Sequence, residues 1–127
     1  MTDPHTPNAG ETSERACIAD IWEQARSNHE RYSATGDAES DLRFLTLGLC
    51  GEAGELANFV KKRWRDGTAL DRATGLLHLD ECRKECADVL AYTMMVAQRL
   101  GMSPADLIDT VAEKQAVFVA KMEARQP

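Results

Sequence analysis

The sequence predicts an all-α fold, built as a four-helix bundle. Three observations support this prediction. The chain is rich in Ala, Leu, Glu, Arg and Met, which favour helix over sheet. Apolar residues recur at helical spacing in four separate segments, and no segment carries the alternation typical of a strand. With 127 residues and mostly short connections, the chain suits a single bundled domain that gains stability by forming oligomers.

The first helix should follow a polar tail. Residues 1–11 are polar and contain Pro, Gly and Asn, so we expect a disordered tail, with residues 12–127 forming the single helical domain. The helix should run from Thr12 to Tyr32. Its apolar stripe comprises Ile18, Ile21, Trp22 and Ala25. His29 is expected at the surface or at a helix end.

The second helix should begin after a turn at Gly36, since SATGDAES breaks the helical pattern. Either Ser40 or Asp41 can cap its start. The helix should end at Arg65, and residues 67–77 should form a linker with at most one helical turn.

The third and fourth helices have the clearest end signals. The third fits residues 78–100 and is closed by Gly101, a residue that favours helix ends. Ser103 can cap the fourth helix, and Asp106 lies where a capping box places its carboxylate. That helix should run from Pro104 to about Ala124.

Composition and charge restrict the classes of function. The net charge is −6, which disfavours a general nucleic-acid binder because such proteins need a basic surface. A phosphorylated ligand can still bind if metal ions lie between the two negative partners. The four cysteines form no C-x-x-C pair, and neither a membrane-spanning stretch nor a signal peptide is present. We therefore expect a cytoplasmic protein.

Two pairs of carboxylates suggest the chemistry. Glu52 and Glu55 are three residues apart on the second helix, so they share a face beside its apolar stripe. Glu85 and Asp88 repeat this spacing on the third helix. Buried, unpaired carboxylates are costly, and like charges close together increase the cost. A divalent cation relieves both problems, and ligands that are all oxygen favour Mg²⁺, with Mn²⁺ as a substitute.

The alternative is that these acids lie on solvated faces and pair with basic neighbours such as Lys61, Lys62, Arg83 or Lys84. A single E-x-x-E favours that alternative. Two such pairs on adjacent helices, the first flanked by glycines, favour the metal site.

The pattern resembles a known family. E-A-G-E at 52–55 followed by E-C-A-D at 85–88 resembles the E-x-x-E and E-x-x-D signature of the MazG-like nucleoside triphosphate pyrophosphohydrolases, and D-V-L-A-Y at 88–92 fits as well. The resemblance covers about residues 40–121. It implies a Mg²⁺-dependent enzyme that cleaves a nucleoside triphosphate between the α and β phosphates. It also implies that the four carboxylates bind the metal, and that the chain forms a homotetramer or a dimer.

The remaining candidates lie near this signature. Glu55 is the choice for the base that activates water. Lys61 and Lys62 can reach phosphates or stabilise the negative end of their helix. Tyr92 can contact the nucleotide or lie half-buried in the core. Glu81, on the stripe of Glu85, is a candidate helper.

Three further residues lie outside the two motifs. Lys114 and Lys121 stand where the family carries basic residues on its last helix, but Phe118 replaces an expected Asn, which leaves the base and ribose contacts open. Trp22 can stack on a base, although a tryptophan on an apolar helix face more often belongs to the core.

Competing functions remain open. Phosphoribosyl-ATP pyrophosphohydrolase is a relative with similar chemistry, and a non-catalytic oligomeric module that binds nucleotides or a partner is the alternative outside enzymes. A ferritin-like di-iron site is excluded because neither His29 nor His78 follows a Glu by three residues. The sequence does not show which nucleotide base the substrate carries, nor does it show the biological role.

Overall fold

The structure is a computed structural model that describes residues 17–66 and 72–126. This part of the chain forms four helices and no strand, which confirms the all-α prediction. The predicted tail and part of the predicted linker lie outside the described residues. The helices are α2 (Ile18–Tyr32), α3 (Ala38–Asp66), α4 (Arg72–Arg99) and α5 (Pro104–Glu123). None of them combines the length and hydropathy that a membrane crossing requires.

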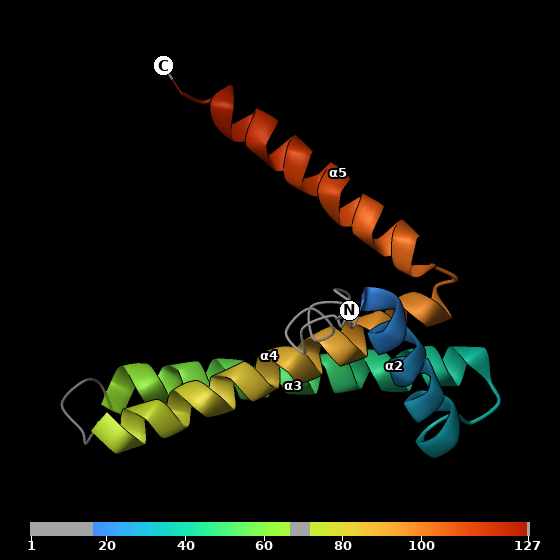
Figure 1. Cartoon of the computed structure of the whole chain (residues 1–127), viewed down its shortest axis with the longest axis horizontal. Helices are drawn as coiled ribbons and strands as arrows, with labels where there is room; N and C mark the ends of the chain where they lie inside the picture. The colour runs from blue at the N-terminus through green and yellow to red at the C-terminus, as the bar shows by residue number, and fades with distance from the viewer. Residues whose placement is uncertain (1–16, 67–71, 127) are drawn as a thin grey trace, which may run out of the picture.

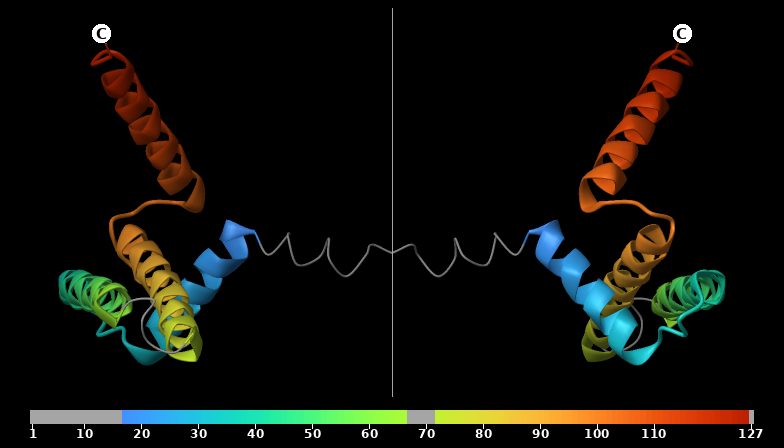
Figure 2. Two further views of the ribbon diagram at one scale, coloured as in Figure 1. Left: turned by 90° about the vertical axis from the view of Figure 1, so that its left-hand side faces the viewer. Right: turned by 90° about the vertical axis from the view of Figure 1, so that its right-hand side faces the viewer.

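The four helices are arranged unequally. The long helices α3 and α4 lie side by side as an antiparallel hairpin, α2 crosses one end of it, and α5 projects away (Figures 1 and 2). No residue of α5 is buried, and its main contact is with α2. The single chain therefore does not close into the predicted four-helix bundle. Of the four described helices, α2, α3 and α4 pack together, while α5 contacts them near its start, through Leu107, and then projects away from the hairpin.

The helix ends follow the sequence signals with two corrections. Asp37, rather than Ser40 or Asp41, caps α3: its Oδ2 accepts the Ser40 backbone N–H at 2.9 Å. Helix α4 begins at Arg72, six residues before the predicted start at residue 78, so much of the expected linker is helical.

The other end signals behave as predicted. Gly36 and Gly101 have φ values of 84° and 77°, in the left-handed region that glycine adopts without strain. The capping box of α5 is complete. Ser103 Oγ accepts from the Asp106 backbone N–H at 3.1 Å, and Asp106 Oδ2 accepts from the Ser103 backbone N–H at 2.8 Å.

The core lies where α2 crosses the hairpin. Trp22 and Ala25 of α2 pack against Met94 and Ala97 of α4. The predicted stripe of α2 is thus only half correct, since Ile18 and Ile21 are exposed. The buried positions of α2 continue instead to His29, which lies one turn beyond Ala25. His29 is 2% exposed, so it is not a surface residue, but it does lie in the last turn of α2, as the helix-end alternative predicted.

A buried polar cluster joins the same three helices. His29 Nδ1 lies 2.6 Å from Ser33 Oγ, and its Nε2 lies 3.6 Å from Asp41 Oδ2. The other oxygen of Asp41 accepts the backbone N–H and the hydroxyl of Thr35, at 2.8 and 2.7 Å. Arg99 Nη1 lies 3.9 Å from Asp41 Oδ2. Asp41 therefore connects α3 to the end of α2 and the end of α4.

Candidate metal centre

Three of the four predicted carboxylates meet between α3 and α4. Glu52 on α3, and Glu85 and Asp88 on α4, each offer one oxygen, and these oxygens all lie within 4.8 Å of one another. The antiparallel pairing of the two helices produces this arrangement, because it sets the E-x-x-E segment beside the E-x-x-D segment. These three residues are called the carboxylate triad below.

Glu85 is the buried member of the triad. It is 8% exposed, and its Oε2 has no hydrogen-bond partner. Its pKa is raised, first by burial, then by hydrogen bonding with Glu52 and by the negative charges of Glu55, Glu52 and Asp88. The surroundings of Glu85 in the described part of the chain therefore disfavour its charged form.

Glu55 lies beside the triad rather than within it. Its side chain is exposed, and its oxygens are outside the group that meets within 4.8 Å. Its charge nevertheless raises the pKa of Glu85, which shows that the two carboxylates are neighbours. Three of the four predicted carboxylates therefore meet at the site, and Glu55 lies outside this group but near enough for its charge to act on Glu85.

The donor set fits a hard divalent cation. Carboxylate oxygens are the ligands that Mg²⁺ and Mn²⁺ prefer. A cation would also supply the partner that Glu85 Oε2 lacks and offset the repulsion between the acids. Within the described residues, no ion pair joins a Lys or Arg to the triad, although Asp88, like Glu55, is exposed to solvent as the alternative expected.

Tyr92 packs against α3 one turn from the triad. A Cβ atom added at Gly48 would lie 2.9 Å from Cδ1 of the Tyr92 ring, closer than real contacts allow. Gly48 therefore permits the close approach of the two helices next to Glu52. Sequence reasoning considered the glycines at 51 and 54 and missed Gly48, although its position one turn before Glu52 was a signal. Gly51 and Gly54 have nothing within 4 Å of such an added Cβ.

The two candidate lysines on α3 differ in position. Lys62 is half-buried, and its Nζ lies 5.0 Å from the centre of the Phe59 ring. Because Glu55, Phe59 and Lys62 follow each other at steps of four and three residues, they share one face of α3. Lys61 is exposed and points about a quarter-turn or more away from that face. Sequence reasoning missed Phe59, which holds the Lys62 side chain.

Glu81 does not join the triad. Its Oε1 accepts from Lys84 Nζ at 3.1 Å, and the same ammonium lies 3.2 Å from Asp80. The predicted helper thus takes part in a helix-surface ion pair.

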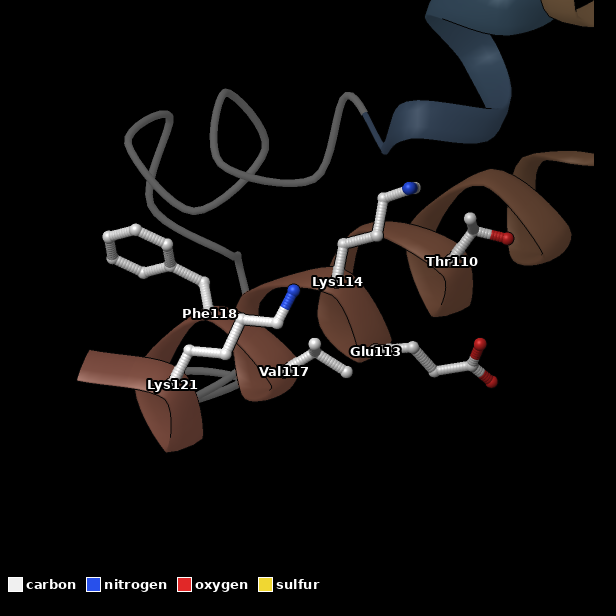
Figure 3. Close-up of a pocket in the computed structure, with 6 residues that line it drawn as sticks. All are labelled: Thr110, Glu113, Lys114, Val117, Phe118 and Lys121. Carbon is white, nitrogen blue, oxygen red and sulfur yellow. The ribbon is translucent and has the colours of Figure 1, made fainter. Parts of the chain in front are cut away.

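The remaining predicted residues lie away from the triad. Trp22 is buried in the core at 6% exposure, so its ring offers no free face for a base. Lys114 and Lys121 are on α5, which projects from the hairpin, and the single chain does not bring them to the carboxylates. With Phe118 they line a shallow concavity of about 520 Å³ along α5 (Figure 3). The lining residues within the described part of the chain all come from this one helix.

One curated protein relates this chain to a family. Over 83 residues the chain is 39% identical to the Gene 37 protein of Mycobacterium phage L5, a match that covers 64% of this chain and 70% of that protein. The chain belongs to the family of this phage protein. The relative's name states no activity. No family model matches the chain, and no solved structure matches it significantly.

Proposed function

We propose that the chain is a Mg²⁺-dependent nucleoside triphosphate pyrophosphohydrolase that acts in the cytoplasm as a homo-oligomer. It would cleave an NTP or dNTP between the α and β phosphates, releasing the monophosphate and pyrophosphate. The observation that carries the proposal is the carboxylate triad, whose most buried member has an oxygen without a partner. The resemblance of both acidic motifs to the MazG-like enzymes supplies the reaction.

The triad would hold the cation. Glu52, Glu85 and Asp88 supply the ligand oxygens, and the bound ion would offset negative charge on the phosphates and on the pyrophosphate leaving group. Mn²⁺, with the same preference for oxygen, should substitute for Mg²⁺.

Glu55 would act on water. Because it is exposed beside the triad, its carboxylate can orient the attacking water and accept its proton as the oxygen bonds to the α phosphorus. The bond from that phosphorus to the bridging oxygen then breaks, and pyrophosphate leaves.

Lys62 would bind the β and γ phosphates, which leave as pyrophosphate. It lies seven residues beyond Glu55 on the same face of α3, about 10 Å along the helix axis. Phe59 restrains its side chain, so less conformational entropy is lost when the ammonium meets a phosphate. Lys61 lacks both features.

The test is pyrophosphate release from a panel of NTPs, dNTPs and phosphoribosyl-ATP with Mg²⁺ or Mn²⁺. We expect release from at least one nucleoside triphosphate, and loss of at least about a hundredfold in Glu52→Gln and Asp88→Asn. Glu39→Gln, an exposed change on the same helix, should keep full activity. If no substrate releases pyrophosphate, or if either triad variant is fully active, the proposal is wrong.

Two further variants assign the roles. Glu55→Gln should lose hydrolysis but keep binding of Mn²⁺, whereas Asp88→Asn should lose both. Lys62→Met should lower kcat/KM by about tenfold, while Lys61→Met should change it little. If the two lysine variants change kcat/KM equally, Lys62 does not bind the phosphates.

A further inference from the structure

The last turns of α3 concentrate positive charge on an acidic protein. Residues 56–65 contain four basic residues and no acid, although the whole chain has a net charge of −6. The hairpin places this segment at its tip, the end away from α2 (Figure 1). Basic residues in a last turn also stabilise the negative end of a helix, so the charge alone does not indicate a ligand.

Trp64 lies within this charged segment and is the second observation. It is 86% exposed, more than any other exposed large hydrophobic residue in the described part of the chain. Stabilising a helix end does not require an indole, and an indole in water is unfavourable compared with a buried one. Tryptophan is enriched at binding surfaces, where its large flat ring contacts a partner.

Three basic residues surround the indole. At 100° per residue, Arg63 and Arg65 lie about 100° to either side of Trp64 on α3, and Lys61 lies about 60° from it. We call Lys61, Arg63, Trp64 and Arg65 the tip patch. Lys62 is not part of it, because it points about 160° away from Trp64.

The charge of the tip patch is available to a ligand. Within residues 17–66 and 72–126, neither Lys61 nor Arg63 forms an ion pair. By contrast, Arg43 and Lys84 on the same hairpin each pair with an acid one turn away. The patch therefore combines an exposed aromatic face with cations that the described chain does not neutralise.

We propose that the tip patch binds single-stranded nucleic acid, with a nucleobase stacked on Trp64 and phosphates against Lys61 and Arg63. Stacking on aromatic rings beside cations that follow the backbone is the way in which proteins hold single strands of any sequence. A duplex keeps the faces of its nucleobases within its own stack, so it should bind less well. Because the rest of the chain is acidic, binding should be confined to the patch and strongest at low salt.

The tip patch is separate from the carboxylate triad. Trp64 lies nine residues beyond Glu55, about 14 Å along α3. Nine residues make two and a half turns, so the two side chains point in opposite directions. The inference therefore goes beyond the proposed hydrolysis and does not depend on it.

An anionic membrane fits the patch less well. Helices that lie on membranes bury a broad apolar face together with their basic residues. In residues 56–66, Val60 is the only other exposed large hydrophobic side chain besides Trp64. One indole and one valine do not form such a face.

The first experiment titrates the full chain with a single-stranded oligothymidine of about ten nucleotides at low salt. EDTA is present, so that phosphates cannot bind through a cation at the triad. We expect saturable quenching of tryptophan fluorescence, and Trp64 is its source because Trp22, the other tryptophan, is buried. A duplex of the same length should bind at least about tenfold more weakly.

Variants assign the contacts, with affinity measured by the anisotropy of a labelled oligothymidine. Trp64→Ala should weaken binding at least about fivefold. Tyr32→Ala is the matched control and should bind like the wild type, because Tyr32 is 75% exposed and also lies beside a basic residue, Arg31, but is outside the patch. Lys61→Met should reduce the slope of log affinity against log salt by about 0.7, the loss of one phosphate contact.

Several outcomes would overturn the inference. They are a wild type that does not bind the oligothymidine at low salt, a preference for the duplex, and equal effects of Trp64→Ala and Tyr32→Ala. Binding to vesicles that contain phosphatidylserine, without binding to the oligothymidine, would assign the patch to membranes instead.

Discussion

At the scale of single residues, Glu85 points to the site because one oxygen of its buried carboxyl has no hydrogen-bond partner. Its carboxyl is buried among three other acids, and burial is the first cause of its raised pKa. A residue selected only for folding would be better satisfied as Gln, which has the same shape and no charge. In our proposal the acid is needed because its charge binds the cation.

This explanation makes a prediction about stability. Without divalent cations, Glu85→Gln should unfold at a higher temperature than the wild type, because the repulsion from Glu55, Glu52 and Asp88 is removed. With Mg²⁺ the wild type should gain stability and the variant should not. Thermal melts in EDTA and in excess Mg²⁺ measure both effects. A variant that is less stable in EDTA would show that the Glu85 charge is already satisfied within the protein.

The sequence predicted the carboxylates better than their roles. Three-residue spacing sets each pair of acids on one face of its helix, because helix periodicity is local, and the antiparallel packing of α3 and α4 then brings Glu52, Glu85 and Asp88 together. The exposure of Glu55 and the pairing of Glu81 with Lys84 depend on how α3 and α4 face each other. One sequence does not fix that rotation.

At the scale of elements, the α3–α4 hairpin depends on a close approach at Gly48. Gly48→Ala would improve helix propensity but would press a methyl group against the Tyr92 ring, so we expect a net loss of roughly 1–3 kcal/mol. Gly51→Ala is the matched control, since open space surrounds that position, and it should gain about 0.5–1 kcal/mol. Urea unfolding of both variants measures the difference. A stabilised Gly48→Ala would show that the ring moves aside at little cost.

The junction of α2, α3 and α4 depends on a charged Asp41. Hydrogen bonds from Thr35 are the first cause of its lowered pKa, and His29 and Arg99 add to the effect. Since the folded pKa lies below the ordinary aspartate value, the charged group stabilises the fold above that value. This stability is lost as the pH falls through the folded pKa. Asp41→Asn should therefore melt several degrees lower near neutral pH and lose less stability on acidification. Asp109→Asn, an exposed change on α5, should have the same unfolding temperature as the wild type at every pH. If the unfolding temperature of Asp41→Asn also follows that of the wild type across this pH range, Asp41 does not stabilise the junction.

Element boundaries were predictable where a signal is local. The capping box of α5 and the turns at Gly36 and Gly101 each depend on a few adjacent residues. The burial of His29 was not predictable in this way. It depends on Asp41, twelve residues further along the chain, and on Arg99 at the end of α4.

At the scale of the whole molecule, the described chain exposes more large hydrophobic side chains than it buries. The buried hydrophobic residues are Trp22, Ala25, Leu45, Cys82, Met94 and Ala97. Such a small core stabilises a short chain weakly, and a helix that projects without buried residues adds little to it. The bundle expected from the sequence is therefore completed, in our proposal, by a second copy rather than within one chain.

If association stabilises the fold, the unfolding temperature must depend on protein concentration, because dissociation precedes or accompanies unfolding. We expect the wild-type unfolding temperature to rise steadily over a roughly hundredfold range of concentration. Because α5 has no buried residue, we expect its apolar side chains to take part in the association. Val111→Glu should then melt at a lower temperature that no longer varies with concentration. Val117→Glu, an equally exposed change on the opposite side of α5, should keep the dependence of the wild type. Calorimetry at several concentrations measures all three, and a wild-type unfolding temperature that stays constant would show that one chain is stable alone.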